Sequence, residues 1–510
     1  MYKSFDQIIR ELPPEYDREI NMHGACLDRT FVVLDDDPTG CQTVHDVPVS
    51  FRWDQGTLVH YLSRESRMLF ILVNTRSLPE EEAVTIISEV MRNLRAASVA
   101  TGRAFVVISR SDSTLRGHYP AEVDAIEKQF GTEKYMHCLI PAFFPGGRYT
   151  VNDMHYVREG DQMIPASETP FAADKVFGYN NSHLARYVEE KTDGRVSVRQ
   201  VLSFPVPGMR ENGPAFVKEK LMQSSAPVCI VNAMAQSDLD VFAAGAWEAI
   251  LEGKRMIFRS GASFLNSMGC IPVKEPLDHK QLRSSTEKGG LIIVGSHVPK
   301  TSAQMAPLLA SPAIVSIELP VQQILTSDRE KNIYSLVGRI EQLLDDGKHV
   351  MVYTSREPFH ADHFNQDQDP VRQGSAGKEA VDAGQTEPSE TSISHSGQVG
   401  SSGFSDAMPE QCKSSELTDL QIGQRVSESL VDLVAGIGTT PSFIIAKGGI
   451  TSHNIASKGL GIEWSTVIGQ AMPGVPVLVP DDRPDLKYII FPGNVGDEDA
   501  LMTLFLKLTK

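Results

Sequence analysis

The chain runs Phe31-Val32-Val33-Leu34-Asp35-Asp36-Asp37-Pro38-Thr39-Gly40 near its amino end, and the other motifs can be arranged around these ten residues. Its apolar run predicts a buried strand, and the acids followed by Pro and Gly predict a sharp turn where that strand ends. In open α/β sheets ligands bind beyond the carboxyl ends of strands, and three adjacent carboxylates repel one another unless a cation or a hydroxyl-rich ligand uses them. The alternative is an acidic turn that caps a helix, but a cap needs a single Asp. We therefore predict a binding site at this turn.

Length and composition indicate a folded protein of more than one domain. A chain of 510 residues is too long for a single core, and 41% hydrophobic with 22% charged residues is typical of globular proteins. The net charge of −17 argues against nucleic acid or an anionic membrane as partner, because phosphate binding depends on clustered Lys and Arg. There is no apolar run of membrane-spanning length and no signal-peptide core. The six cysteines are far apart, which favours a reducing compartment, so we expect a cytoplasmic enzyme.

Strand-like and helix-like segments alternate on either side of a polar stretch. In the first part, residues 68–73, 104–108, 228–231 and 256–258 read as strands, and 79–100 and 239–251 as helices. A second alternation begins at residues 291–294 and includes strands at 314–319, 348–353 and 442–446. Such alternation predicts parallel sheets covered by helices. Residues 148–193 are polar and irregular by comparison, either a lid or substrate loop or a plain surface excursion.

These patterns predict an α/β fold with two domains, each a mostly parallel sheet covered by helices, and a cleft between them. We place an amino-terminal lead-in at 1–28, a first domain at 29–277 and a second at 289–510. Residues 357–415 are rich in Ser, Gly, Gln, Asp and Glu without apolar periodicity, which predicts a disordered insertion in the second domain.

A second polar cluster follows the strand that ends at Ile108. It reads Ser109-Arg110-Ser111-Asp112-Ser113-Thr114-Leu115-Arg116-Gly117-His118 and concentrates hydroxyls, a carboxylate and two guanidinium groups. Recognition of a polyhydroxylated carboxylate requires such groups, because a guanidinium binds a carboxylate through two parallel hydrogen bonds. The alternative is an ion pair between Asp112 and Arg116 on a helix surface.

Glycine turns adjoin predicted strands of the second domain. They are Gly295-Ser296, Gly448-Gly449 and Gly493-Asn494-Val495-Gly496. Glycine lets backbone N–H groups approach phosphate closely. None of these turns matches a P-loop or a dinucleotide fingerprint, so they indicate either a nucleotide site or ordinary turn glycines.

Together these motifs resemble the four-carbon acid sugar kinase family over almost the whole chain outside the insertion. Asp36-Asp37-Pro38-Thr39-Gly40 matches the family's D-D-x-T-G, and Asp112-Ser113-Thr114-Leu115-Arg116-Gly117 matches D-S-T-x-R-G. Pro141-Ala142-Phe143 with Gly147-Arg148 looks like P-A-F…G-R, and the three glycine turns resemble the G-S, G-G-[DE]-T-S and G-N-x-G turns of the nucleotide-binding domain. Ile450 replaces the usual acid of the second turn, so only backbone contacts are expected there.

The resemblance implies transfer of the ATP γ-phosphoryl group to a hydroxyl of a sugar acid of the threonate, erythronate or 3-oxo-tetronate type, with Mg²⁺ as cofactor and metal ligands unassigned. It implies a catalytic role for Asp36 or Asp37. The residues it implies for sugar-acid binding are Arg76, Arg110, Asp112, Ser113, Thr114, Arg116 and Gly117. Those it implies for ATP are Ser296, Gly448, Gly449, Ile450, Thr451, Gly493 and Gly496. A homo-oligomer is left open.

Two other functions use the same residues. A haloacid-dehalogenase-type phosphatase also presents D-x-D-x-T after an apolar strand, which would make Asp35 the nucleophile and Asp37 the acid/base. A sugar-acid sensor without enzymatic activity would hold its nucleotide as a structural ligand.

Overall fold

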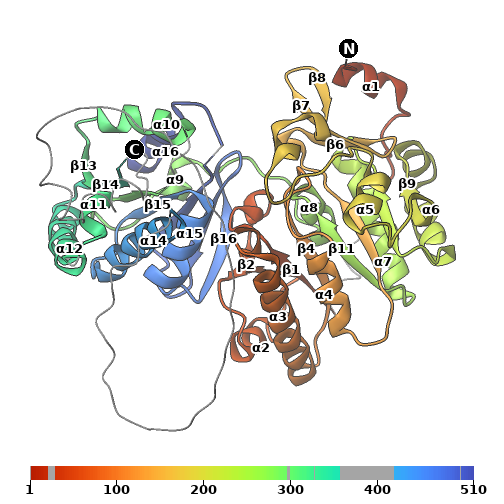
Figure 1. Cartoon of the computed structure of the whole chain (residues 1–510), viewed down its shortest axis with the longest axis horizontal. Coiled ribbons are helices and arrows are strands. Elements are labelled where there is room, and N and C mark those ends of the chain that lie inside the picture. Colours follow the sequence, from red (N-terminus) through yellow and green to blue (C-terminus); the bar gives the residue numbers. More distant parts are fainter. Residues whose placement is uncertain (1, 21–28, 296–298, 327, 356–418, 494) are drawn as a thin grey trace, which may run out of the picture.

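The computed structural model describes residues 2–20, 29–295, 299–326, 328–355, 419–493 and 495–510. Within them, a fifteen-stranded sheet runs through the whole molecule, and a three-stranded sheet lies apart from it. Figure 1 shows two halves side by side, the amino-terminal half carrying β1 to β11 and the other half carrying β12 to β18. The predicted α/β class, with mostly parallel strands covered by helices, is confirmed.

The first half is a parallel sheet in the order β2-β3-β1-β4-β11-β5-β10-β9. Its central strand β1 pairs with β3 on one side and β4 on the other, so Asp35 lies level with Leu72 and Arg110. The strands are β1 (Arg29–Asp35), β2 (Val47–Ser50), β3 (Met68–Leu72), β4 (Ala104–Arg110), β5 (Met136–Ile140), β9 (Val201–Phe204), β10 (Val228–Val231) and β11 (Met256–Ser260). The chain thus moves from one side of β1 to the other, and such a switch point opens a crevice at the carboxyl ends of the strands.

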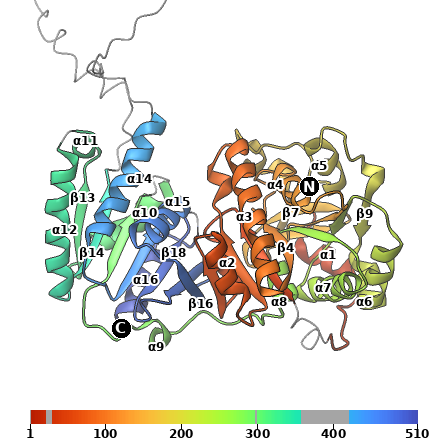
Figure 2. The same ribbon diagram turned by 90° about the horizontal axis from the view of Figure 1, so that it is seen from below.

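Helices cover both faces of this sheet because both faces of β1 are apolar. Val32 and Leu34 belong to one buried cluster and Phe31 and Val33 to another. Figure 2 shows α3 and α4 on one side of the sheet and α7 and α8 on the other. The helices of this half are α1 (Phe5–Glu11), α2 (Gln55–Leu62), α3 (Glu80–Thr101), α4 (Ala121–Gln129), α5 (Leu184–Lys191), α6 (Val206–Gln223), α7 (Gln236–Leu251) and α8 (Ser263–Gly269).

The second half has a parallel core of five strands in the order β13-β14-β12-β15-β18, followed by the antiparallel strands β17 and β16. The strands are β12 (Leu291–Val294), β13 (Ile314–Leu319), β14 (His349–Thr354), β15 (Phe443–Lys447), β16 (Trp464–Met472), β17 (Val475–Pro480) and β18 (Lys487–Phe491). The helices are α9 (His279–Leu282), α10 (Pro299–Leu309), α11 (Val321–Ile324), α12 (Arg329–Asp345), α14 (Asp419–Gly436), α15 (Gly449–Asn454) and α16 (Ala500–Thr509).

The two halves join edge to edge, which the sequence did not indicate. β16 pairs antiparallel with β2, from Trp464 opposite Ser50 to Val467 opposite Val47. A single ladder therefore connects the amino-terminal and carboxy-terminal strands.

Residues 148–193 are more regular than the sequence indicated. They contain the antiparallel strands β6 (Arg148–Val151), β7 (Met154–Glu159) and β8 (Gln162–Pro165), followed by α5. The lead-in packs against this sheet, since Phe5 N–H donates to the Asp161 carbonyl at 2.9 Å. These strands are short and show little alternation of apolar and polar residues in the sequence, so they were hard to recognise.

The predicted insertion at 357–415 lies outside the described residues, and α14 begins just beyond it at Asp419. Among the described helices, none is both long and apolar enough to cross a membrane.

Candidate active site

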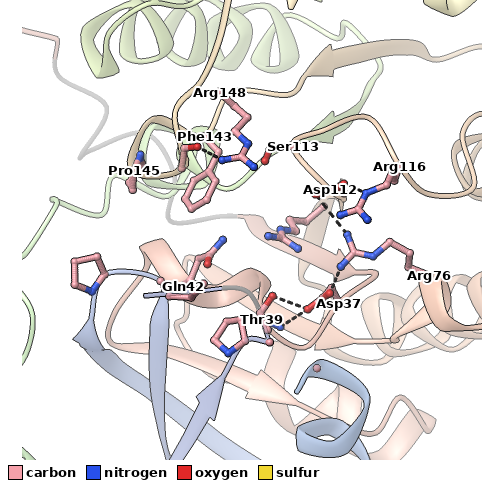
Figure 3. Close-up of a pocket in the computed structure, with 18 of the residues that line it drawn as sticks. Asp37, Thr39, Gln42, Arg76, Asp112, Ser113, Arg116, Phe143, Pro145 and Arg148 are labelled. Carbon is pink, nitrogen blue, oxygen red and sulfur yellow. Dashed lines mark hydrogen bonds and ion pairs between the residues drawn. The ribbon is translucent and has the colours of Figure 1, made fainter. Parts of the chain in front are cut away.

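A pocket of about 420 Å³ lies where the loops of the two halves meet. Its first-half wall carries Asp37, Arg76 and Asp112, and its second-half wall carries four glycines, Gly449, Gly474, Gly493 and Gly496. Figure 3 shows Arg76 between the two carboxylates, with Arg116 beside it and Arg148 across the cavity. The two clusters that the sequence singled out therefore open onto one cavity.

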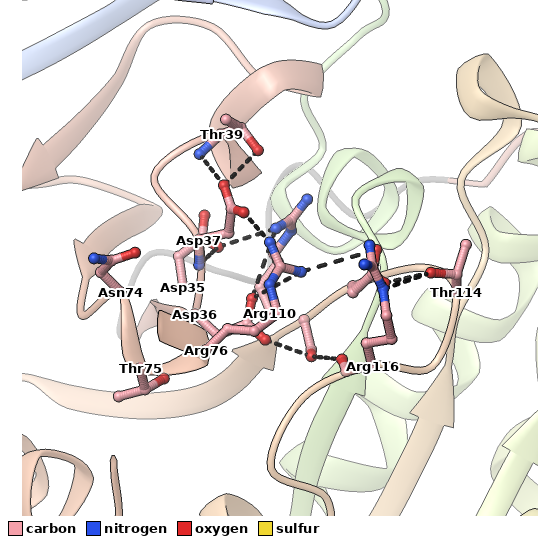
Figure 4. Close-up of polar contacts among 12 residues, drawn as sticks. Asp35, Asp36, Asp37, Thr39, Asn74, Thr75, Arg76, Arg110, Thr114 and Arg116 are labelled. Carbon is pink, nitrogen blue, oxygen red and sulfur yellow. Dashed lines mark hydrogen bonds and ion pairs between the residues drawn. The ribbon is translucent and has the colours of Figure 1, made fainter. Parts of the chain in front are cut away.

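The three aspartates at the carboxyl end of β1 have different environments (Figure 4). Asp35 is fully buried and accepts from Arg110 at 3.2 Å. A Cβ at position 40 would overlap the Asp35 carboxylate, so the turn requires Gly40. Burial raises the pKa of Asp35 to about 7, although the charge of Arg110 opposes this change. Asp35 thus supports the turn from beneath, and a substrate cannot reach it.

Asp36 is also buried, and it accepts from the Ser111 hydroxyl at 2.6 Å. Its other oxygen, Oδ1, lies 3.7 Å from Arg76 Nη1 and 3.9 Å from Arg110 Nη1. Asp36 does not line the pocket. It lies beside the guanidinium groups of Arg76 and Arg110, which do line the pocket.

Asp37 reaches the cavity. Its Oδ1 accepts from the Thr39 N–H at 2.8 Å and from the Thr39 hydroxyl at 2.6 Å, and its Oδ2 pairs with Arg76. On the opposite side, a Cβ at Gly449 would lie 3.6 Å from Asp37 Oδ1. The first acidic motif and the second glycine turn therefore lie next to each other.

Asp112 begins the turn after β4 and binds the side chains that follow it. Its Oδ2 accepts from Arg116 Nε at 2.7 Å and from the Thr114 hydroxyl, and its Oδ1 lies 3.8 Å from Arg76 Nη1. Burial alone would raise the pKa of Asp112, but the charges of Arg76 and Arg116 outweigh it and hold that pKa well below its ordinary value. Asp112 is a permanently ionised acceptor.

Two other residues of this motif shape the turn from outside the pocket lining. The Thr114 carbonyl accepts from Tyr179 at 2.8 Å. Gly117 has a φ of +124°, and a Cβ there would lie 2.7 Å from both Arg259 Nη2 and Ser111 Oγ. Ser113, in contrast, lines the cavity.

The cavity is locally positive in an acidic protein. Its lining includes two carboxylates, Asp37 and Asp112. It also includes four guanidinium groups, those of Arg76, Arg110, Arg116 and Arg148. Arg116 and Arg148 both lie over the ring of Phe171, at 5.2 and 5.4 Å. Because Arg148 makes no ion pair with a carboxylate among the described residues, its charge is available to an anion. Arg148 belongs to the G-R motif, but the sequence alone did not indicate that it lies in the site.

The glycine turns differ in their contribution. Gly449, Gly493 and Gly496 line the pocket, whereas Gly448, Ile450 and Thr451 lie outside the lining. Gly448 has a φ of +110°, the Ile450 side chain is 54% exposed, and a Cβ at Gly295 would overlap Thr451. Ser296 lies outside the described residues.

Lys447, at the end of β15, is a site residue that sequence reasoning missed. It is fully buried, and its Nζ donates to the Pro492 carbonyl at 2.6 Å and to the Gly493 carbonyl at 3.3 Å. Burial, with the nearby charge of Lys300, lowers the pKa of Lys447 to about 7. This side chain fixes the loop that forms the second-half wall. The sequence feature that could have indicated its role is its position directly before a glycine pair at the end of a predicted strand.

The phosphatase alternative does not fit this geometry. It requires Asp35 as a nucleophile facing the substrate, and Asp35 is buried beneath Gly40.

Two family models match the chain. Residues 31–268 match a sugar-binding N-terminal domain, and residues 291–383 and 402–501 match a nucleotide-binding C-terminal domain. The pocket lies between these two matched regions, with walls from both.

Two curated relatives are similar over part of their length. A D-threonate kinase of Bordetella bronchiseptica is 32% identical over 121 residues, which is 24% of this chain and 27% of that protein. A D-erythronate kinase of Heliobacterium modesticaldum is 24% identical over 293 residues, 57% of this chain and 61% of that protein. The chain thus aligns with less than two thirds of either relative.

Solved structures share the fold across nearly the whole chain. A Haemophilus influenzae protein aligns with 93% of this chain and 99% of its own, at a TM-score of 0.57 and 18% identity. A Salmonella typhimurium protein aligns with 94% and 98%, at a TM-score of 0.60 and 15% identity.

Proposed function

The chain belongs to the four-carbon acid sugar kinase family, and from that premise we propose that it transfers the γ-phosphoryl group of ATP to a hydroxyl of a four-carbon sugar acid. The observation that carries this proposal is that Asp37 and Gly449, from the two halves of the chain, lie next to each other in the lining of one cavity. Phosphoryl transfer needs the acceptor hydroxyl and the γ-phosphate in line and adjacent. A site divided between the two halves of the chain meets this need only if both halves reach the same point.

The carboxylate of the sugar acid would bind to Arg116 and Arg148. Arg76 is already paired with Asp37, and Arg110 is already paired with Asp35. Arg116 uses its Nε on Asp112, and its Nη1 lies 3.8 Å from Asp174 Oδ2, so Nη2 is the nitrogen that would reach a ligand. A planar guanidinium beside a second one suits a carboxylate, and the ionised Asp112 would accept from a substrate hydroxyl.

Asp37 is our candidate for the residue that orients the attacking hydroxyl and takes its proton. Asp36 is covered, and the low pKa of Asp112 makes it a poor base. Little charge develops on the attacking oxygen in a loose transition state, so an ordinary carboxylate accepts the proton late in the reaction.

The nucleotide phosphates would lie along Gly449, Gly493 and Gly496, where the absence of side chains leaves the backbone N–H groups accessible. Mg²⁺ would enter with ATP and neutralise the β- and γ-phosphates. Both carboxylates of the pocket are paired with guanidinium groups, so we assign no protein ligand to the ion.

The test is to incubate the full chain with ATP, Mg²⁺ and a panel of threonate, erythronate and 3-oxo-tetronate. We expect ADP release that depends on one of these acids. Phosphate release from sugar phosphates without ATP would instead indicate a phosphatase. Tight ATP binding without turnover of any four-carbon acid would indicate a sensor.

A further inference from the structure

A second cavity, of about 660 Å³, lies at the other end of β5 from the active site. The carboxyl end of β5 leads to Phe143 in the active-site pocket, whereas His137, next to its amino end, lines the second cavity. Asp124 and Glu127 line the same cavity from α4. We refer to Asp124, Glu127 and His137 as the α4–β5 cluster. The proposed kinase mechanism does not use any of these residues.

The three side chains direct one ligand atom each toward a common point. One oxygen of Asp124, one oxygen of Glu127 and a nitrogen of His137 lie within 4.8 Å of one another. Asp124 and Glu127 are three residues apart on α4, so both project from one face of the helix toward the strand.

Neighbouring groups hold the remaining carboxylate oxygens. Arg195 donates to Asp124 Oδ2 at 2.6 Å, and the Tyr135 N–H donates to Glu127 Oε1 at 2.9 Å. Donors of this kind orient metal-ligating carboxylates, because they fix one oxygen and direct the other at the ion. The inward atoms are therefore Asp124 Oδ1, Glu127 Oε2 and His137 Nε2.

Among the described residues, two of these inward atoms are buried without a hydrogen bond, although His137 Nε2 lies at ion-pair distance from Glu127. Asp124 Oδ1 and His137 Nε2 are shielded from solvent, and within the described part of the chain neither makes a hydrogen bond. His137 is only 8% exposed, and its Nε2 lies 3.5 Å from Glu127 Oε2, beyond a good hydrogen bond. A buried polar atom without a partner costs free energy, so a ligand that satisfies both atoms at once would be stabilised here.

We propose that the α4–β5 cluster binds one transition-metal dication of the Zn²⁺ type and clamps α4 to the amino end of β5. One imidazole and two carboxylates give three ligands, and the cavity leaves room for water to complete the coordination. Asp124 and Glu127 supply two negative charges for the ion, and Arg195, which pairs with Asp124, offsets one of them. The imidazole selects against Mg²⁺, which prefers oxygen ligands throughout.

The experiment is a titration of the metal-stripped full chain with Zn²⁺ in the presence of excess Mg²⁺, followed by calorimetry and by melting temperature. We expect one equivalent to bind and the melting temperature to rise. Asp124→Asn and His137→Gln each remove a ligand without a large change of shape. Each should weaken Zn²⁺ binding at least about 100-fold, because even outer partners of metal ligands are worth 10–100-fold. Co²⁺ should give visible absorption bands in the parent chain that both variants lose.

Glu133→Gln is the matched control. Glu133 is a nearby carboxylate that pairs with Arg255 outside the cluster, so its loss should leave Zn²⁺ affinity unchanged. The melting temperatures of the metal-free variants show whether they are folded, and kinase activity with Mg²⁺ and ATP should be unaffected in all of them. The proposal is overturned if the parent chain takes up no Zn²⁺, if Mg²⁺ displaces it, or if both cluster variants bind it as tightly as the parent.

Discussion

Asp37→Asn tests the assignment of the reacting groups most directly. Asn keeps the side-chain oxygen that accepts from the Thr39 N–H, but it removes the charge that pairs with Arg76. Asp37 is only 19% exposed, so the lost charged interaction should cost about 2 kcal/mol in the free energy of unfolding. The protein should remain folded.

The effect on catalysis should be much larger than the effect on stability. A positioned general base contributes roughly 10²–10⁴-fold, so kcat should fall by about that factor. ATP affinity should stay the same or increase slightly, because the variant loses a negative charge beside Gly449, where the phosphates would lie. The assay is steady-state ADP release combined with calorimetric titration of ATP.

Asp112→Asn is the comparison. It removes the same charge from the same cavity, but at a group that we assign to substrate binding. We expect KM for the sugar acid to rise while kcat falls much less than in Asp37→Asn. If Asp37→Asn kept more than a tenth of the parent kcat, or if it lost ATP affinity, the role given to Asp37 would be wrong.

Four further variants test separate parts of the site. Gly40→Ala should destabilise the fold by about 3 kcal/mol in urea unfolding, since the new methyl overlaps the buried Asp35 carboxylate; an unchanged midpoint would contradict the packing described. Gly449→Ala meets only ordinary contacts, 3.6 Å or more from Asp37 and Pro38, so melting should be unaffected while ATP binding weakens several-fold. Arg116→Met should raise KM for the sugar acid at least about 30-fold, the effect of losing one charged partner, with ATP binding as the control. Lys447→Met should change how the free energy of unfolding depends on pH. The pKa of Lys447 is about 7 in the folded chain and 10.5 in the unfolded chain. Burial of this lysine therefore lowers the free energy of unfolding most below pH 7, and this loss disappears as the pH rises to 10.5. The parent chain should therefore gain up to about 1.4 kcal/mol per pH unit across that range relative to the variant, and parallel unfolding curves would exclude the lowered pKa.

Local sequence patterns were sufficient to predict the ends of the strands. Apolar runs bounded by charged or glycine-rich turns located β1, β4, β12 and β15, and residues that follow β1, β4 and β15 line the pocket. Periodicity depends only on neighbours in the chain, which is why these predictions succeeded. The same logic explains the omission of β2, whose four residues include a proline and show no clear alternation.

Roles set by tertiary contacts could not be predicted in this way. Asp35, Asp36 and Asp37 are chemically identical in sequence, and only the packing of Gly40 and Arg110 makes the first a buried support and the third a pocket residue. Arg148 and Lys447 are distant in sequence from the motifs they serve. Their partners, the ring of Phe171 and the carbonyl of Pro492, belong to segments whose position depends on the whole fold.

The continuous sheet explains how the two walls of the pocket meet, although strand directions alone suggest that they should not. The pairing of β2, β16, β17 and β18 is antiparallel at three successive steps, so β15 runs opposite to β1 within the ladder. In a flat sheet, Asp37 and Gly449 would lie at opposite edges. Six neighbour steps separate β1 from β15, and a twist of roughly 20–25° per step accumulates to about 120–150°. This rotation offsets most of the reversal, so the carboxyl ends of both strands face one cavity. The antiparallel strands β16 and β17 therefore act as the spacer that directs the loops after β1 and β15 toward each other.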